Sequence, residues 1–166
     1  MVNMVHKITL LIPLIVVAAI IGAIGFTFIS SEIKNKHFEF ARGTVKINSD
    51  LINVEIAKSS AERQRWLMFR EQRSPFNSAM VLIYDKPDLY SLWLLNIEYN
   101  LDLIWFDENG NVVYVVKDAS PCKTILDAST CTYKNTKVAK YVIAAASGFI
   151  DTHRVTIESH MTIISI

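Results

Sequence analysis

The most restrictive feature of the sequence is an uncharged apolar stretch close to its start. From Ile8 to Ile29, 22 consecutive residues carry no charged side chain. As a helix, such a run crosses the roughly 30 Å hydrocarbon core of a bilayer, and its proline and glycines are tolerated there. The rest of the chain is too small to bury it. We therefore expect residues 1–7 to be an N-terminal flank and residues 8–29 to be a transmembrane helix.

The length of this stretch also bears on whether it is retained. A cleaved signal peptide has an apolar core of roughly 7–15 residues, followed by small residues at the cleavage site. Here Phe26 and Phe28 continue the apolar run past Ala23-Ile24-Gly25, a poor cleavage site. This favours a signal-anchor and a single-pass membrane protein. The excess of Lys and Arg after the helix favours a cytoplasmic C-terminal side, whereas the cysteines discussed below favour export.

The remaining chain divides into a polar linker, residues 30–43, and a globular part, residues 44–166. Residues 30–166 contain sixteen basic and sixteen acidic side chains, because Lys7 is the only charged residue before them. A balanced charge gives no basic surface of the kind that binds nucleic acid. We expect the chain to contact the lipid bilayer through residues 8–29 and not to bind nucleic acid.

Short stretches of alternating apolar and polar residues indicate β-strands in the globular part. Residues 44–47 and 51–57 predict one hairpin, and residues 101–106 and 112–116 predict a second across Asp107–Gly110. A capping box at Ser59 and Glu62 predicts one helix over about residues 60–69. Further strands are expected at 80–84, 92–97, 138–145, 155–157 and 162–166. This pattern predicts a mainly β (α+β) fold, a compact twisted sheet or partly closed barrel with one short helix.

Several short motifs follow one another along this part of the chain. They are Val54-Glu55-Ile56-Ala57, Glu62-Arg63, Leu67-Met68-Phe69-Arg70, Trp93, Asn96, Leu101-Asp102, Asp107-Glu108-Asn109-Gly110, Pro121-Cys122, Cys131-Thr132-Tyr133, Ala139-Lys140-Tyr141-Val142 and Gly148-Phe149. Together they resemble the family called domain of unknown function 192, over about residues 44–161. The resemblance implies a compact β-rich fold, often behind an export signal or a membrane anchor, and no established activity.

The chain departs from the family pattern at several polar positions. Trp66 replaces a glycine, Leu95 a basic residue, Ile97 a threonine and Asn100 a proline. Near the end, Ile157-Glu158-Ser159 stands where the family has Val-Gly-Asp. A polar site of the family around the tryptophan strand would therefore be reduced in this chain.

Cys122 and Cys131 are the only cysteines. We expect them to form a disulfide with Cα atoms within roughly 7 Å, which requires an oxidising compartment. The alternative is a redox pair, but the spacing is not C-x-x-C and no helix start lies there to lower a thiol pKa. Two cysteines alone do not build a zinc site, and no metal site is predicted.

Four residues form the candidate polar pocket: Arg70, Trp93, Asn96 and Asp102. Asp102 lies in an apolar run that predicts a strand buried on both faces. Its carboxylate therefore needs a cation or several hydrogen-bond donors as partners. Arg70 is the first choice of partner and the Asn96 amide the second. The alternatives are an Arg70 that grips a carboxylate or phosphate, and a purely structural hydrogen-bond network. His153 and His160 read as surface histidines.

The motifs of common enzyme classes are absent from the sequence: a serine-nucleophile motif, a glycine-rich phosphate loop and H-E-x-x-H. We therefore predict no catalytic residues and no cofactor. The expected protein is a cell-membrane protein with an extracytoplasmic β-rich domain, a non-catalytic binding or accessory module for an unknown protein or small molecule. The alternatives are a small hydrolase that uses Asp102 with Arg70, and a purely structural assembly subunit.

Overall fold

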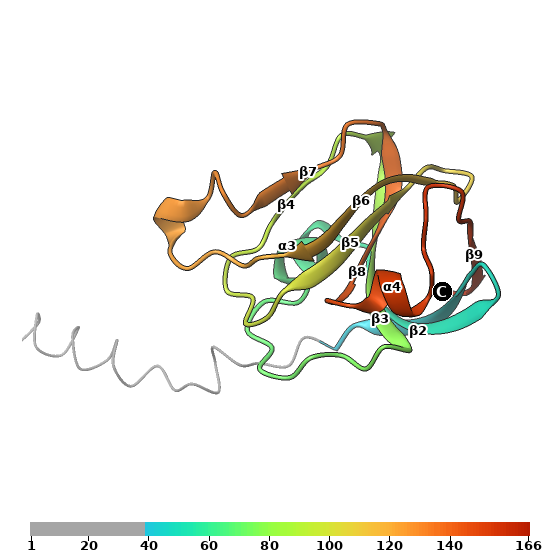
Figure 1. The fold of residues 1–166 in the computed structure, drawn as a ribbon, viewed down its shortest axis with the longest axis horizontal. Helices are drawn as coiled ribbons and strands as arrows, with labels where there is room; N and C mark the ends of the chain where they lie inside the picture. The colour runs from blue at the N-terminus through green and yellow to red at the C-terminus, as the bar shows by residue number, and fades with distance from the viewer. Residues whose placement is uncertain (1–38) are drawn as a thin grey trace, which may run out of the picture. The chain divides into compact units, whose positions relative to one another are not determined.

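Residues 39–166 are described by the computed structural model, and most of their regular structure is β-strand (Figure 1). The predicted transmembrane segment, residues 8–29, lies outside the described residues. Within residues 39–166, no helix is both long and apolar enough to cross a bilayer. The first strand starts at Ala41, inside the predicted linker, and Phe40 before it is buried. The folded domain therefore begins a few residues earlier than the predicted boundary at residue 44.

The described elements follow in the order β1 (Ala41–Ile47), β2 (Asp50–Ala57), α3 (Ser60–Arg65), β3 (Ser78–Asp88), β4 (Ser91–Trp93), β5 (Leu101–Phe106), β6 (Val112–Ala119), the 3-10 turn η1 (Ile125–Asp127), β7 (Thr132–Lys134), β8 (Ala139–Ala146), α4 (Phe149–Thr152) and β9 (Met161–Ser165). Seven strands form one sheet in the order β6-β5-β8-β3-β2-β1-β9, and β4 and β7 form a separate ribbon. The sheet is mixed, because β2 and β3 are parallel and its other neighbours antiparallel. The mainly β prediction is confirmed, and the sheet is not a closed barrel.

The two edges of the seven-stranded sheet meet at one point. The turn between β5 and β6 lies against the start of β9, where the Met161 N–H donates to the Gly110 carbonyl at 2.7 Å. Asn111 and His160 form an isolated bridge beside it. The sheet therefore curls far enough to bring its edges together at this turn.

We expect Gly110→Ala to lower the free energy of unfolding by about 2 kcal/mol, because it strains this contact. A Cβ at Gly110 would lie 2.1 Å from the Met161 carbonyl oxygen, and the φ of Gly110 is +88°. Urea unfolding of the full-length chain measures the loss. Gly148→Ala serves as a comparison, because its φ is also positive, at +95°, but its nearest new contact is a flexible Phe76 ring at 3.3 Å. Equal losses in both variants would contradict a role for the edge contact.

Hydrophobic residues are buried on both faces of the sheet. All six residues of β5 are buried, and they alternate between two clusters. Ile104 and Phe106 join the cluster that contains Phe149 and Ile150 of α4, named here the α4 cluster. Leu101, Leu103 and Trp105 join the cluster that contains Trp66 and Leu67, which follow α3, named here the α3 cluster. The prediction that β5 is buried on both faces is confirmed.

The local signals of the sequence have mixed outcomes. Both hairpins and the capping box at Ser59 are confirmed. The helix ends at Arg65 rather than near residue 69, because Trp66 adopts a φ of +21°, which a helix does not allow. Residues 92–97 are not a central strand: only Ser91–Trp93 are extended, and they pair with β7. Residues 155–157 are not a strand either, because the Ser159 N–H closes a turn onto the Thr156 carbonyl.

Tyr84 gives the folded domain a sensitivity to alkaline pH. Its ring stacks on Tyr90 at a centroid distance of 3.5 Å, and burial raises the pKa of Tyr84 to about 12. The neutral phenol is thus favoured in the folded state. Its contribution to stability is complete below the unfolded value of about 10 and is lost as the pH rises through about 12. We expect Tyr84→Phe to flatten the loss of stability over this range, measured by denaturant unfolding at successive pH values. Parallel curves for the two proteins would exclude Tyr84 as the cause.

Candidate functional site

The four predicted pocket residues do not converge on one pocket. Asp102 shares its face of β5 with Ile104 and Phe106, in the α4 cluster. Arg70 forms an ion pair with Glu55 of β2. The neighbours of Glu55 in this strand, Val54 and Ile56, belong to the α4 cluster, so the Glu55 side chain points to the other face of the sheet. The predicted pair between Arg70 and Asp102 is therefore wrong. Side-chain alternation along the two strands places their carboxylates on opposite faces of the sheet.

Asp102 is stabilised by backbone donors instead of a cation. The residue is 1% exposed, and its carboxylate accepts from the N–H groups of Asp118 at 2.9 Å, Gly148 at 3.1 Å and Ile150 at 2.8 Å. Three donors provide the compensation that a buried carboxylate needs. Asp102 thereby fastens the ends of β6 and β8 and the start of α4 to β5. With its oxygens engaged in this way, it is a structural group and is not placed to act as a general base.

A second carboxylate extends this polar arrangement to the surface. Asp118 accepts from the Ser147 hydroxyl at 2.6 Å and from the Asn100 amide at 3.0 Å. These two hydrogen bonds lower the pKa of Asp118. The hydrogen bonds of this carboxylate keep the chain around Ser147 in place.

Arg70 belongs to a loop, residues 69–77, that is named here the arginine loop. Besides its ion pair with Glu55, the Arg70 guanidinium lies over the Phe40 ring, 5.5 Å from its centroid. The Phe69 N–H donates to the Asn96 carbonyl at 2.7 Å, and both residues have positive φ angles, of 62° and 56°. The structure thus brings Arg70 and Asn96 into neighbouring segments, joined through the backbone and not through their side chains.

The far end of the arginine loop is fixed by two further contacts. The Arg73 guanidinium donates to the Ser147 carbonyl at 3.1 Å. The His153 ring lies 2.7 Å from the Phe76 carbonyl through Nε2 and 2.7 Å from the Asp50 carboxylate through Nδ1. The surface reading of His153 is therefore wrong, because its side chain is only 11% exposed. Its partners come from distant parts of the chain, which no local sequence signal indicates.

Trp93 and Asn96 lie outside any shared pocket. Trp93 is 37% exposed on the β4–β7 ribbon, opposite Thr132. The side chain of Asn96 is exposed, and the contact of this residue with the arginine loop comes from its carbonyl. Of the four predicted residues, only Arg70 therefore presents a partly exposed charged group.

Tyr99 carries a buried polar group without a partner. No hydrogen-bond partner of its hydroxyl oxygen is found among residues 39–166. The Ser74 side chain lies close enough to act on the pKa of Tyr99, which burial raises. We expect Tyr99→Phe to leave the free energy of unfolding unchanged or to raise it by up to about 1 kcal/mol. Tyr90→Phe is the matched control, because the Tyr90 hydroxyl donates to the Lys86 carbonyl at 2.5 Å and its loss should cost about 1 kcal/mol. Thermal and urea unfolding compare the two, and a clear loss in Tyr99→Phe would reveal a hydrogen bond there.

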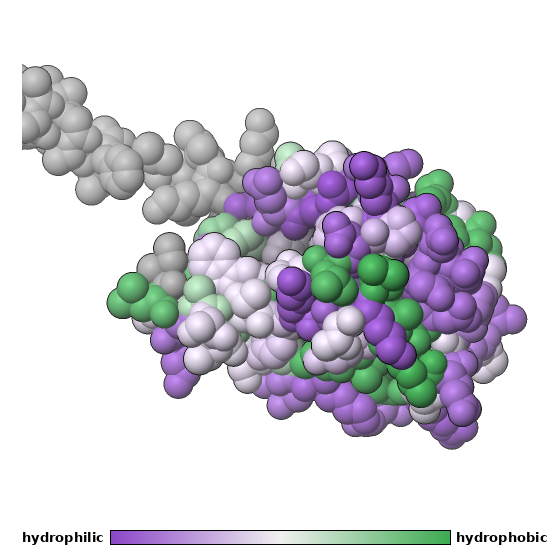
Figure 2. All heavy atoms as spheres, turned by 90° about the horizontal axis from the view of Figure 1, so that it is seen from above, coloured by the Kyte–Doolittle hydropathy of each residue, from purple (hydrophilic) through white to green (hydrophobic). Residues whose placement is uncertain are grey.

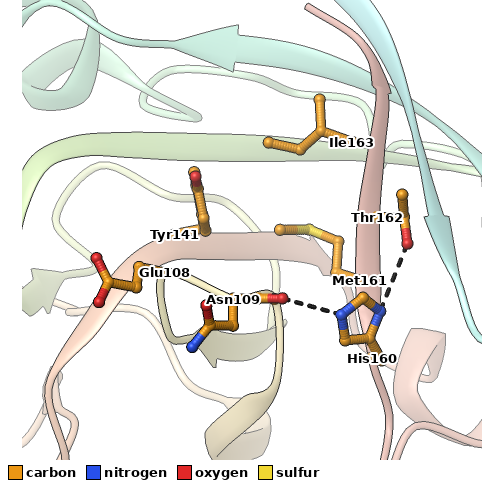
Figure 3. A pocket seen from close by; sticks show the side chains of 8 residues that line it. Glu108, Asn109, Tyr141, His160, Met161, Thr162 and Ile163 are labelled. Atoms are coloured by element: carbon orange, nitrogen blue, oxygen red, sulfur yellow. Dashed lines mark hydrogen bonds between the residues drawn. The ribbon is translucent and has the colours of Figure 1, made fainter.

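A shallow pocket of about 200 Å³ opens where the β5–β6 turn meets β9 (Figure 3). It is lined by Glu108, Asn109, Gly110, Tyr141, His160, Met161, Thr162 and Ile163. His160 contacts the Asn109 carbonyl through Nε2 at 2.9 Å, and because a carbonyl only accepts, Nε2 carries the hydrogen. This volume is below the roughly 300–1,000 Å³ of typical ligand sites. None of the predicted site residues lines it.

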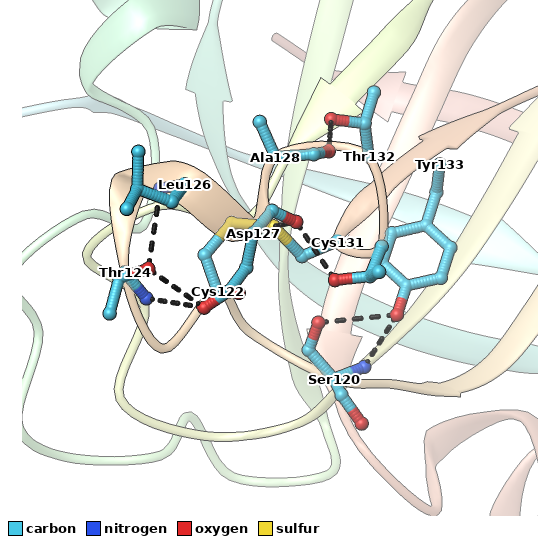
Figure 4. Close-up of a disulfide and its surroundings, with 10 residues drawn as sticks. Ser120, Cys122, Thr124, Leu126, Asp127, Ala128, Cys131, Thr132 and Tyr133 are labelled. Atoms are coloured by element: carbon cyan, nitrogen blue, oxygen red, sulfur yellow. Dashed lines mark hydrogen bonds between the residues drawn. A yellow bond between two sulfur atoms is a disulfide. The ribbon is translucent and has the colours of Figure 1, made fainter.

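The cysteine-bearing loop is built around a disulfide (Figure 4). Cys122 and Cys131 are bonded with a Cα separation of 5.2 Å, so the predicted pairing is confirmed. Between them, Thr124 and Asp127 cap the turn η1 reciprocally. The Tyr133 hydroxyl accepts from the Ser120 N–H at 2.8 Å at the base of the loop. Neither the turn nor β7 was expected, since both are only three residues long.

Two solved structures share this fold. A “putative transcription regulator” from Sinorhizobium meliloti aligns at 18% identity with a TM-score of 0.68, covering 76% of this chain and 97% of its own. A protein of unknown function from Novosphingobium aromaticivorans aligns at 18% identity with a TM-score of 0.65, covering 73% and 84%. At such identities the likeness shows the fold alone. Comparison with curated proteins finds no match.

The fold, a curled mixed sheet with a hydrophobic cluster on each face, thus recurs in these two proteins. The family model of domain of unknown function 192, described as an uncharacterised ACR, matches residues 43–163. The chain therefore belongs to this family, and the resemblance found in its motifs is confirmed.

Proposed function

We propose that this protein is a membrane-anchored, extracytoplasmic module that binds a partner near the membrane without catalysing a reaction. The observation that carries the proposal is the disulfide between Cys122 and Cys131, which lies in a structured loop of the domain. Disulfides persist in oxidising compartments and are rare in the cytosol. The uncharged run at residues 8–29 supplies the anchor in this proposal.

The environment of Asp102, the candidate catalytic group of a hydrolase, supports a binding role instead. Asp102 is buried, and its carboxylate accepts hydrogen bonds from three backbone N–H groups. A general base must reach the proton that it abstracts, and a carboxylate engaged in this way does not. The exposed polar and aromatic groups of the arginine loop are instead of the kind that contact partners.

Topology reporters test the proposal directly. The full-length chain is expressed in bacterial cells with alkaline phosphatase or a green fluorescent protein fused to its C-terminus. We expect phosphatase activity, no fluorescence, and a fusion that stays in the membrane pellet after alkaline extraction. Deleting residues 8–29 should move the fusion to the soluble fraction. A fluorescent, phosphatase-inactive fusion would place the domain in the cytoplasm and overturn the proposal.

A further inference from the structure

The buried polar groups of this domain are more distinctive than its surface. On the face shown in Figure 2, hydrophobic residues lie in small groups between hydrophilic ones. His153, which follows the last residue of α4, has a side chain that is only 11% exposed. We propose that His153 is a pH switch, which fixes the arginine loop to the domain while its ring is protonated and releases it as the pH rises.

The two partners of the His153 ring determine how many hydrogens it has to carry. Nδ1 lies 2.7 Å from the Asp50 carboxylate, and Nε2 lies 2.7 Å from the Phe76 carbonyl. An ionised carboxylate and a carbonyl only accept hydrogen bonds, so each ring nitrogen has to donate. A neutral imidazole has a single N–H, whereas the imidazolium has two. Both contacts therefore form only with the protonated ring.

The carboxylate beside the ring remains charged over the range in which histidines titrate. The hydrogen bond from His153 is the main cause that lowers the pKa of Asp50, and the Ser49 hydroxyl and the Arg154 charge lower it further. Asp50 is thus ionised throughout the range of about pH 5–8 in which an ordinary histidine exchanges its proton. The group of this pair that changes its charge near neutral pH is the imidazole.

The other elements packed around the ring place little free charge against it. Within α4, Asp151 forms an ion pair with Lys117 of β6. The Phe149 ring, whose centroid lies 4.4 Å from that of the His153 ring, and the Phe76 carbonyl carry no charge. The contacts at Nδ1 and Nε2 are therefore the ones that depend on the proton.

Loss of the proton breaks one of these two contacts. A hydrogen bond to a charged acceptor is about twice as strong as one to a neutral acceptor, so the remaining N–H stays on Nδ1, toward Asp50. Nε2 then presents a lone pair to the Phe76 carbonyl, and two acceptors at 2.7 Å repel each other. The contact between the ring and the arginine loop is therefore the one that is lost.

The release is confined to the arginine loop, because its flanks have hydrogen bonds of their own. The Asn77 carbonyl accepts from the Asn53 N–H at 3.0 Å, and the Phe69 N–H donates to the Asn96 carbonyl at 2.7 Å. Phe76 is 48% exposed, so the end of the loop can move without opening the sheet. The inference requires neither an anchor nor a partner and goes beyond the proposed function.

His160 provides an internal comparison. Its Nε2 donates to the Asn109 carbonyl at 2.9 Å, and its Nδ1 accepts from the Thr162 hydroxyl at 3.4 Å. A neutral ring satisfies both contacts, so no second hydrogen is needed. Of the two histidines within residues 39–166, only His153 has contacts that require the imidazolium.

Nuclear magnetic resonance of the full-length chain in neutral detergent micelles tests the switch across and beyond about pH 5–8. With ¹⁵N-histidine, the ring nitrogens of His153 should have the similar shifts of an imidazolium in acid and the unequal shifts of a neutral ring with Nδ1–H in alkali. Phe76-Asn77 is the only Phe-Asn pair in the sequence, so carbonyl-¹³C phenylalanine with ¹⁵N-asparagine gives one signal, which reports the Phe76 carbonyl. We expect this signal to shift along the same pH curve as the His153 ring.

Three variants and a second labelled pair separate the switch from general effects of pH. His153→Gln should make the Phe76 signal independent of pH, and Asp50→Asn should lower the midpoint of the curve by about one pH unit, because the imidazolium loses its counter-charge. His160→Gln is the matched control and should leave the curve unchanged. Phe69-Arg70, the only Phe-Arg pair, reports the other end of the loop with ¹⁵N-arginine and should change little. Circular dichroism verifies that each variant is folded.

Four results would overturn the inference. The first two are a His153 ring that has only one hydrogen already at the acid end, and a ring that keeps both hydrogens over the whole range. The others are a Phe76 signal that stays constant while the ring titrates, and one that still shifts with pH in a folded His153→Gln variant.

Discussion

Asp102→Asn is expected to lower the free energy of unfolding by about 3–4 kcal/mol, the largest effect that we predict for a single substitution. The asparagine side chain has one acceptor oxygen, whereas the Asp102 carboxylate accepts from three N–H groups through two oxygens. The amide nitrogen would face a backbone donor and leave it unsatisfied in a buried site. Urea unfolding of the full-length chain, followed by tryptophan fluorescence, measures the loss.

A matched aspartate separates this effect from the loss of charge alone. Asp85 is exposed, and Asp85→Asn should change the free energy of unfolding by less than about 0.5 kcal/mol. If Asp102→Asn is as stable as the original chain, the carboxylate is dispensable for the fold. Substitution of a residue that serves function and not folding is expected to leave stability unchanged. That result would therefore call for a direct test of hydrolase activity.

Replacing both Cys122 and Cys131 with serine should lower the free energy of unfolding by about 2.5–3 kcal/mol, according to the loop-entropy model. The bond closes a loop of sequence separation 9 and fixes the segment that carries η1. Unfolding in oxidising buffer compares the variant with the original chain. Adding a reductant should destabilise the original chain by a similar amount and leave the variant unchanged. A reductant effect on the variant would mean that the loss has another origin.

Local signals in the sequence were the reliable ones. The capping box at Ser59 and Glu62 spans four residues, and both of its hydrogen bonds are formed. The alternation within residues 101–106 and the turn residues at Asp107–Gly110 likewise needed no distant information. The disulfide was predictable because only two cysteines exist, so only one pairing is available.

The errors came from the parts that depend on tertiary contacts. The sequence predicts Arg70 as the partner of the Asp102 carboxylate. The actual donors are backbone N–H groups, which every residue except proline carries and which no sequence pattern singles out. The helix after Ser59 stops early because Trp66 turns into the α3 cluster. His153 was read as exposed because Asp50 and Phe76 are far from it along the chain. Composition and spacing carry no record of such pairings.

The meeting of the two sheet edges at Gly110 has a consequence for self-association. An edge strand with free N–H and C=O groups is a template on which another chain can polymerise. Here Met161 on β9 already donates to Gly110, and the β1–β9 register shifts between Thr44 and Val45, which interrupts a regular ladder. The start of β9 is therefore already engaged, and the irregularity beside it disturbs the regular strand geometry that a foreign strand needs. We therefore expect high local concentrations of the domain to be tolerated without fibril growth from this edge, and any partner to be recognised by side chains and not by strand addition.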